Sequence, residues 1–278
     1  MKNKIFIIFI CIVLLFMLVS CSVFFNSSNN SSNNSSNNSS NNSSKIKVGV
    51  GDIILTNGYR IPFEYLENFS YIPQSDVLGI VYNILDVGSY MVICPKPNAL
   101  LNIWDHNETS WVDCYYDEIT ESMLPVYDVP YLWEIDTGDS CGIDNWDVIK
   151  TDLALLEEDI YFFPIFKKMK DFNEYFDSGW YVPTWNEVNN IDEISKVYYT
   201  IFDDYFTGSY WLANSDDYNC AGYFGVEYSF GNGEPFYFKT YNSDSVINTH
   251  SFIFVRNFKD LDESKVVFTE DQYMNIYN

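Results

Sequence analysis

The chain has 278 residues, a formal net charge of −24 at pH 7 and an aromatic content of 19%. So acidic a protein excludes nucleic acid as its natural partner and is repelled by an anionic membrane surface. The charge suits a basic protein, a cation or a neutral sugar as partner, but keeping an aromatic-rich surface soluble explains it equally well.

The first twenty residues have the pattern of an export signal. Lys2 and Lys4 precede an uninterrupted apolar run, Ile5–Val19. This run falls short of the about 20 residues that span a bilayer, which favours a cleaved signal peptide over a signal-anchor helix. The ending Leu18-Val19-Ser20-Cys21 resembles a bacterial lipobox, which implies cleavage before Cys21 and lipidation of that cysteine. Loss of two lysines and no acid would take the net charge from −24 to −26.

Residues 21–44 are predicted to be the lipidated cysteine and a linker. Asn26–Ser44 contains only asparagine and serine. These side chains bury no apolar surface and compete with the backbone for hydrogen bonds, so we expect disorder. As a flexible coil the tract spans about 24 Å, which would hold a folded domain clear of a membrane surface.

The next segments predict antiparallel strands. Val48–Leu55 and Gly58–Pro62 are apolar runs joined by Asn57-Gly58, a turn pair, and indicate a hairpin. Leu78–Leu85 and Tyr90–Cys94 are apolar enough to be buried strands.

The middle of the chain is less regular. Residues 107–133 are acidic and aromatic without a sustained period, and residues 136–147 predict a loop rich in Gly, Asp and Asn. Ile160–Phe176 then has apolar residues at steps of three and four, which predicts an amphipathic helix beginning near Pro164.

A second helix is predicted after Pro183. Thr184 and Glu187 have the spacing of a capping box, and an apolar stripe at helical spacing follows them. Val197–Phe206 predicts a further short helix. Antiparallel strands are then expected at Tyr210–Ala213, Tyr223–Phe230, Phe236–Thr240 and Ser251–Phe258, with Gly231-Asn232-Gly233 as a hairpin turn.

Four cysteines remain outside the signal and the lipobox: Cys94, Cys114, Cys141 and Cys220. In an oxidising compartment they would form two disulfides with three possible connectivities, and free buried thiols are the alternative. Their spacing matches no zinc motif.

Five motifs of the second half carry a family resemblance. In chain order they are Asp144-Asn145-Trp146, Gly179-Trp180-Tyr181-Val182-Pro183-Thr184 with Glu187, Tyr210-Trp211-Leu212-Ala213-Asn214-Ser215, Phe230-Gly231-Asn232-Gly233 and Phe254-Val255-Arg256. This order resembles the Lcl C-terminal domain family, over about residues 136–258. The resemblance implies an α+β, C-type-lectin-like fold of the formylglycine-generating-enzyme kind, with an antiparallel sheet and two or three helices.

The resemblance also implies a domain on a bacterial surface or exported protein, which we expect to span residues 45–258 with a polar C-terminal tail at 259–278. Tyr181-Val182 and Leu212-Ala213-Asn214 depart from the family pattern. The resemblance therefore supports the fold more strongly than it supports any ligand site. Trp180 and Trp211 are expected in the core, where large aromatic residues dominate the packing energy.

Catalysis is not expected. His106 and His250 are the two histidines of the chain, and neither lies near a glycine-flanked serine or in a metal-ligand spacing. Formylglycine-generating enzymes use a cysteine pair in the part of the fold where this chain has Cys220 alone. We therefore predict no catalytic residue and no cofactor.

Two acidic loops offer oxygen atoms to a hard cation. They contain Asp136, Asp139, Asp144 and Asp147, and Asn214, Asp216, Asp217 and Asn219. Neither has the spacing of an EF-hand, so solvated loops are favoured and no metal site is predicted. Trp185-Asn186-Glu187 resembles the calcium motif of sugar-binding C-type lectins, but its place at the start of a helix favours capping.

The candidate ligand-binding residues are Asn214, Asp216, Asp217 and Tyr218, which are predicted to form an exposed loop after an apolar strand. Tyrosine beside amides and carboxylates combines rigid aromatic area with adaptable hydrogen bonding. The alternative site is the aromatic insert between Trp104 and Trp133.

Together these patterns predict a lipid-anchored protein of the cell envelope, at the outer membrane or cell surface. It would bind an extracellular ligand, either a host or matrix protein or a glycan, without catalysis. A structural envelope lipoprotein without external ligand is the alternative, followed by a secreted enzyme.

Overall fold

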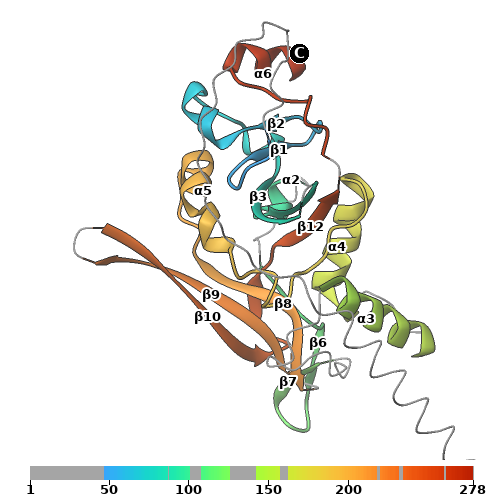
Figure 1. The fold of residues 1–278 in the computed structure, drawn as a ribbon. Helices are drawn as coiled ribbons and strands as arrows, with labels where there is room; N and C mark the ends of the chain where they lie inside the picture. Colours follow the sequence, from blue (N-terminus) through green and yellow to red (C-terminus); the bar gives the residue numbers. More distant parts are fainter. Residues whose placement is uncertain are drawn as a thin grey trace, which may run out of the picture. The chain divides into compact units, whose positions relative to one another are not determined.

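Figure 1 shows the fold in a computed structural model, which describes residues 47–86, 88–100, 108–125, 142–156, 162–217, 220–231, 234–259 and 261–277. Residues 45–278 form one compact unit, and the buried core of the described residues lies within it. The expected signal peptide, Cys21 and the Asn/Ser tract lie outside the described residues. Among the helices in the described part of the chain, none is long and apolar enough to cross a membrane.

The fold is α+β, with mostly antiparallel sheets. The first five-stranded sheet, sheet A, has the order β12-β4-β3-β1-β2. Its strands are β1 (Ile53–Leu55), β2 (Arg60–Ile61), β3 (Val77–Asp86), β4 (Ser89–Cys94) and β12 (Phe254–Lys259). The predicted hairpin is confirmed, since β1 pairs antiparallel with β2. The two predicted buried strands are β3 and β4, which also pair antiparallel, although Ile84 and Leu85 at the end of β3 are exposed. Gly58 has a φ of 81°, as the predicted turn before β2 requires.

The second five-stranded sheet, sheet B, has the order β10-β9-β8-β11-β5. It consists of β5 (Glu108–Ser110), β8 (Gly208–Asp217), β9 (Cys220–Gly231), β10 (Glu234–Ser245) and β11 (Thr249–Ser251). The strands predicted at Tyr210–Ala213, Tyr223–Phe230 and Phe236–Thr240 are confirmed but run longer than expected. The single strand predicted at Ser251–Phe258 is wrong, because this segment is divided between β11 of sheet B and β12 of sheet A. Gly231 is in register with Glu234, so β9 and β10 form the long hairpin drawn in orange in Figure 1.

A separate two-stranded sheet joins β6 (Cys114–Asp117) to β7 (Ser122–Pro125). The prediction of irregular structure was wrong for these residues. Four-residue strands are too short to show a period, and the turn between them is organised by the side chain of Asp117, as described below.

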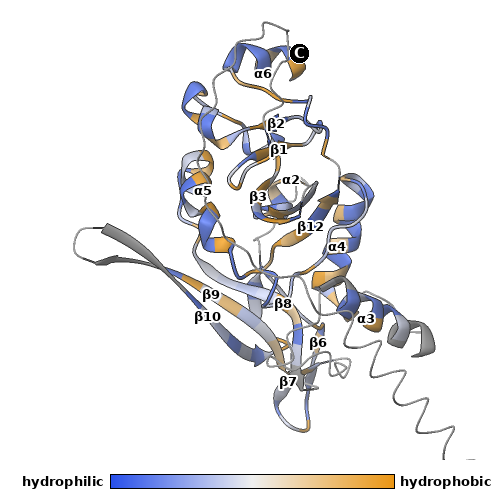
Figure 2. Ribbon diagram, viewed as in Figure 1, coloured by the Kyte–Doolittle hydropathy of each residue, from blue (hydrophilic) through white to orange (hydrophobic). Residues whose placement is uncertain are grey.

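The helices are α2 (Pro97–Leu100), α3 (Gly142–Leu156), α4 (Pro164–Tyr175), α5 (Ser195–Phe202) and α6 (Glu270–Tyr277), with 3-10 turns at η1 (Phe63–Asn68), η2 (Gln74–Asp76) and η5 (Ile191–Ile194). The helix from Pro164 is confirmed, with Ile165, Phe166, Met169 and Phe172 buried. Its mixed hydrophobic and hydrophilic residues are visible in Figure 2.

The predicted loop at residues 136–147 is wrong in its second part, because α3 already begins at Gly142; residues 136–141 lie outside the described residues. The Gly142 N–H donates to Glu187 Oε2 at 2.9 Å. The carboxylate that satisfies this helix N-terminus therefore comes from far along the chain, where no local pattern reveals it.

The helix predicted from Thr184 is also wrong at its start. Residues 185–190 form turns, and regular α-helix begins only at Ser195. The Trp185 N–H donates to Asn214 Oδ1 on β8 at 3.0 Å, which holds the backbone against sheet B instead of in a helical turn. The apolar stripe is nevertheless buried as predicted, at Val188, Ile191 and Ile194.

The C-terminal segment, expected as an appended tail, packs against sheet A. Arg60 on β2 donates its N–H to Lys265 O and accepts from the Val267 N–H, both at 2.9 Å. Tyr273 on α6 is buried, and its hydroxyl donates to Asp76. Val267 and Tyr273 are buried in this otherwise polar segment, and such apolar residues are too far apart in the sequence to produce a periodic signal.

Candidate binding surface

The register of sheet B assigns its residues to two faces. Tyr223 of β9 is in register with Trp211 on the neighbouring strand β8 and with Asn242 on the other neighbouring strand, β10. Ser209 and Thr240 flank Gly225 in the same way. Residues directly opposite each other in antiparallel strands share a face, so these side chains belong together.

One of the two faces is covered. Tyr210 and Phe224 lie on it and are buried, with their rings stacked at a centroid distance of 5.2 Å. Phe206 stacks on Tyr210 at 5.0 Å. This face of sheet B therefore belongs to the hydrophobic core.

The other face is partly open. Along β9, Phe224 and Val226 are buried while Tyr223 is half-buried and Glu227 exposed. On β10, Thr240 and Asn242 are exposed. We call the six residues of this surface the open face: Ser209, Tyr223, Gly225, Glu227, Thr240 and Asn242.

The small residues of the open face lie beside its aromatic ring. A Cβ atom on Gly225 would lie 3.2 Å from Thr240 Oγ1. Because glycine has no side chain, the surface at Gly225 is lower than at the neighbouring residues. Asn242 Nδ2 donates to Thr240 Oγ1 at 3.4 Å. The hydroxyl group of Thr240 and the amide group of Asn242 therefore form a shallow polar surface beside the ring of Tyr223.

Tyr223 is held in place by two other rings. It stacks on His250 of β11 with ring centroids 4.2 Å apart and planes 17° apart. His250 also lies edge-on to Trp211, at 4.4 Å and 88°. Trp211 is fully buried and donates its Nε1–H to Thr109 O at 2.6 Å, which anchors the stack to β5.

His250 is also paired with a carboxylate. Its Nε2 lies 3.1 Å from Asp244 Oδ2, and Asp244 accepts from the Ser245 N–H and from Asn248 Nδ2, both at 2.8 Å. Burial lowers the pKa of His250 despite the opposing effect of Asp244. Burial raises the pKa of Asp244, but the hydrogen bonds from Ser245, Asn248 and His250 outweigh it and hold that pKa below its usual value.

This arrangement favours a neutral imidazole that donates to an ionised carboxylate. The imidazole of His250 contacts the rings of Tyr223 and Trp211 and the carboxylate of Asp244. A histidine held in this way fixes the orientation of Tyr223, which suits a rigid stacking platform for a ligand.

The candidate residues predicted from sequence lie next to this cluster but not as expected. Asn214 is fully buried within β8, so its prediction as an exposed loop residue was wrong. Its Oδ1 accepts from the Trp185 N–H, which makes it a structural link between β8 and residue 185. Asp216 and Asp217 extend β8 and not a loop, and Tyr218 lies outside the described residues. A ligand-binding role of Asp216, Asp217 and Tyr218 stays a prediction.

Sequence reasoning missed Tyr223, Asn242, Asp244 and His250 as a group. β10 carries no alternation of apolar and polar residues that could have indicated an open face, because Phe236–Phe238 are three aromatic residues in a row and Asn242–Ser245 are four polar ones. The stacking of His250 on Tyr223 joins strands that are not neighbours in sequence, and composition gives no sign of it.

The Gly-Trp-Tyr-Val-Pro-Thr motif has a structural role in the described fold. Glu187 Oε2 accepts from the Thr184 N–H at 2.9 Å and from Thr184 Oγ1 at 3.1 Å, and Oε1 accepts from the Tyr181 hydroxyl at 2.7 Å. Burial nevertheless raises the pKa of Glu187. The predicted reach of Glu187 back to Thr184 is confirmed, and so is the burial of Trp180 and Trp211.

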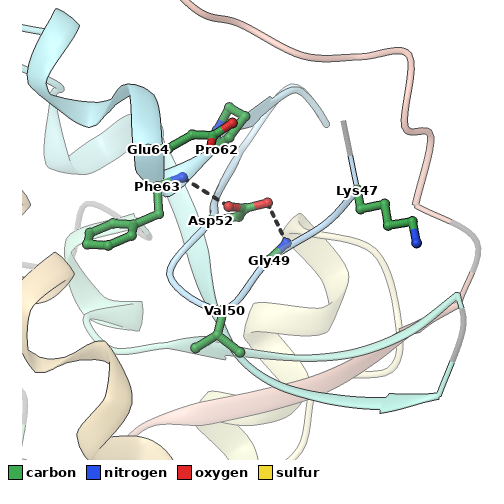
Figure 3. A pocket seen from close by; sticks show the side chains of 7 residues that line it. All are labelled: Lys47, Gly49, Val50, Asp52, Pro62, Phe63 and Glu64. Carbon is green, nitrogen blue, oxygen red and sulfur yellow. Dashed lines mark hydrogen bonds between the residues drawn. The ribbon is translucent and has the colours of Figure 1, made fainter. Parts of the chain in front are cut away.

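A cavity of about 380 Å³ lies at the start of the domain, beside β2 (Figure 3). Its lining includes Asp52, whose carboxylate accepts from the N–H groups of Gly49 and Phe63, both at 2.9 Å. Asp52 also forms a buried ion pair with Arg60. Because these bonds already engage the carboxylate, it is better explained as a structural link than as a ligand site.

Metal-binding groups do not converge in the described ranges, where no cluster of three or more His, Cys, Asp or Glu residues has a suitable arrangement. Asp144 and Asp147 lie on α3, whereas Asp136 and Asp139 lie outside the described residues.

The cysteines that the structure describes differ in burial. Cys94 is buried in β4, and burial raises the pKa of its thiol. Cys114 and Cys220 are half-buried, and Cys141 lies outside the described residues. Cys94 therefore behaves as a small core residue.

No family model matches the chain, and neither a curated protein nor a solved structure matches it. Any argument about function therefore rests on the residues and geometry described above.

Proposed function

We propose that this chain is a lipid-anchored protein of the bacterial cell surface that binds an extracellular ligand through the open face of sheet B, without catalysing a reaction. The proposed fold of the domain is C-type-lectin-like, in line with the motif order of the sequence. Among the expected ligand classes, a neutral glycan fits this face best.

The observation that carries this proposal is the combination of groups on the open face. Tyr223 offers an aromatic surface fixed by His250, and Thr240 and Asn242 offer exposed hydroxyl and amide groups beside it. Sugars have apolar C–H faces that pack on aromatic rings and hydroxyls that require such hydrogen-bonding partners. The small residues Ser209 and Gly225 leave room for a flat ring.

The experiment is a glycan and matrix-protein array probed with residues 22–278, a chain that retains the whole compact unit. Tyr223→Ala tests the open face, and Tyr175→Ala is the matched control, because Tyr175 is 76% exposed at the end of α4. We expect a glycan signal that Tyr223→Ala removes and Tyr175→Ala preserves. Equal signals for all three proteins would exclude the open face as the site.

The anchoring half of the proposal has its own test. Lipid chains on Cys21 would contribute about 0.8 kcal/mol per buried CH₂, so Cys21→Ala should move the full chain out of the detergent phase. Protease shaving of intact cells should remove the domain. A domain that stays protected would favour the structural envelope lipoprotein instead.

A further inference from the structure

The β6–β7 hairpin presents apolar side chains to solvent. Tyr115, Tyr116 and Met123 are each at least 44% exposed, and Ile119 at the tip is 92% exposed. Tyr116 lies opposite Met123 in the register, so these two share a face of the hairpin. Exposed apolar side chains gathered on one short element are a mark of an interaction surface.

The tip of the hairpin is held in one conformation by a single carboxylate. Asp117 accepts from the Ile119 N–H at 3.1 Å, from the Thr120 N–H at 3.3 Å and from Thr120 Oγ1 at 2.7 Å. Glu121 completes the turn with a φ of 53°. Ile119 is therefore displayed on an ordered turn, and little ordering of this turn would be needed on binding.

The charge of the hairpin has one sign. The hairpin, residues 114–125, contains three acids, Asp117, Glu118 and Glu121, and no lysine or arginine. Glu118 and Glu121 are exposed on either side of Ile119. A surface that is both apolar and acidic is complementary to one that is apolar and basic.

We infer that the β6–β7 hairpin is a docking element for a basic protein segment with apolar side chains, in which Ile119 enters an apolar site and Glu118 and Glu121 pair with lysine or arginine. This surface is separate from the open face and does not depend on the proposed glycan binding.

The same observations disfavour the other possible occupants. Anionic lipid headgroups would be repelled by the three acids of the hairpin, so a membrane is a poor match for it. A second copy of this chain is a poor match as well, since the sequence has 39 acidic and 15 basic residues.

The probe for the test is a synthetic amphipathic peptide with lysine on one helical face and leucine on the other. Two matched peptides replace leucine by serine or lysine by glutamate. Residues 22–278 are titrated with each peptide, and anionic phosphatidylglycerol vesicles test the membrane alternative. We expect the lysine/leucine peptide to bind at least about tenfold more tightly than either matched peptide, with no binding to the vesicles.

Two variants locate the contact. Ile119→Ser should weaken the binding of the lysine/leucine peptide about tenfold without changing stability, because the side chain is almost fully exposed. The double variant Glu118→Lys/Glu121→Lys should weaken it further. The controls are Tyr175→Ser and Glu64→Lys/Glu67→Lys, which change an exposed aromatic residue and two exposed acids elsewhere.

Unchanged peptide binding in Ile119→Ser would overturn the proposal. An equal loss of peptide affinity in Glu118→Lys/Glu121→Lys and in the control Glu64→Lys/Glu67→Lys would also overturn it, because binding would then depend on the net charge of the protein. Tight binding to the vesicles would assign the hairpin to a membrane instead.

Discussion

Sheet A and sheet B are both five-stranded, but they are buried differently. In sheet A, consecutive residues from Val77 to Tyr82 on β3 and from Tyr90 to Cys94 on β4 are buried, so side chains on both faces are covered. In sheet B, exposure alternates along β9, with Phe224 and Val226 buried and Tyr223 half-buried. A sheet covered on both faces has its side chains committed to packing, whereas a sheet with one open face has side chains available to a ligand.

The aromatic residues follow the same division. Trp180 and Phe172 lie edge-on at 5.5 Å within the core next to α4. Tyr223 and His250 stack at the surface of sheet B, over the fully buried Trp211. Rings that stabilise the domain are therefore distinct from rings that are available for recognition.

The largest expected effect concerns Trp211, which lies on the same side of sheet B as Tyr223 and is fully buried edge-on to His250. Trp211→Ala should lower the free energy of unfolding by about 3–5 kcal/mol, because it removes a fully buried indole and its hydrogen bond to Thr109. Urea unfolding measures this change. A variant as stable as the wild type would place Trp211 among the recognition residues and erase the division.

Glu187 should rank next. Glu187→Gln should cost about 2–3 kcal/mol, because a neutral amide oxygen replaces the charged acceptor of the Gly142 and Thr184 N–H groups and the amide nitrogen then faces the Tyr181 hydroxyl, which donates to Glu187. Urea midpoints measure the loss, and Glu67→Gln on exposed η1 is the control. An unchanged urea midpoint in Glu187→Gln would mean that a neutral amide can replace the carboxylate in these buried hydrogen bonds.

Glu187 also predicts a pH dependence. Because burial raises its pKa in the folded state, the folded protein holds this proton more tightly than the unfolded chain does. The free energy of unfolding should therefore fall as the pH rises from the ordinary glutamate pKa through the raised one. Glu187→Gln should remove this slope, and an unchanged pH profile would contradict the raised pKa.

A smaller effect is expected at Thr184. Thr184→Ala should lower the free energy of unfolding by about 1 kcal/mol, because it removes the hydroxyl that donates to Glu187. If Thr184→Ala cost as much as Glu187→Gln, the hydroxyl and not the carboxylate would hold the network together. Urea midpoints of the single and double variants decide this.

The smallest effect is expected at His250. Its pKa is lowered in the folded protein, so the unfolded chain takes up this proton first as the pH falls below the ordinary histidine pKa. Stability should decline from that point down to the lowered pKa, and His250→Gln should flatten this part of the profile. The pKa of Asp244 is lowered too, so its contribution should disappear only at a lower pH. A profile that is unchanged in His250→Gln would contradict the burial of the imidazole.

Much of the fold could be predicted from local patterns, and the candidate site could not. The hairpin at Asn57-Gly58 and the helix from Pro164 were predictable because turn chemistry and apolar spacing are local. The start of α3 was missed because its N-terminal N–H is satisfied by the distant Glu187. Asn214 was predicted to be exposed because it is polar, but the Trp185 N–H stabilises its side chain inside the protein.

The site was missed for a related reason. Tyr223, Asp244 and His250 come from β9, β10 and β11, and only the pairing of these strands brings them together. A polar residue in the sequence was expected to be exposed, and the structure reverses this expectation at Asn214, which is fully buried.

The most direct test of the open face is hydrogen–deuterium exchange on the wild-type protein with and without a glycan that binds it on the array. The account predicts slower exchange at the ends and edges of strands that border the open face, in residues 223–227 and 240–244, and no change in β3 and β4 of sheet A. Protection confined to the β6–β7 hairpin or to residues around Asp52, with none in β9 and β10, would contradict it.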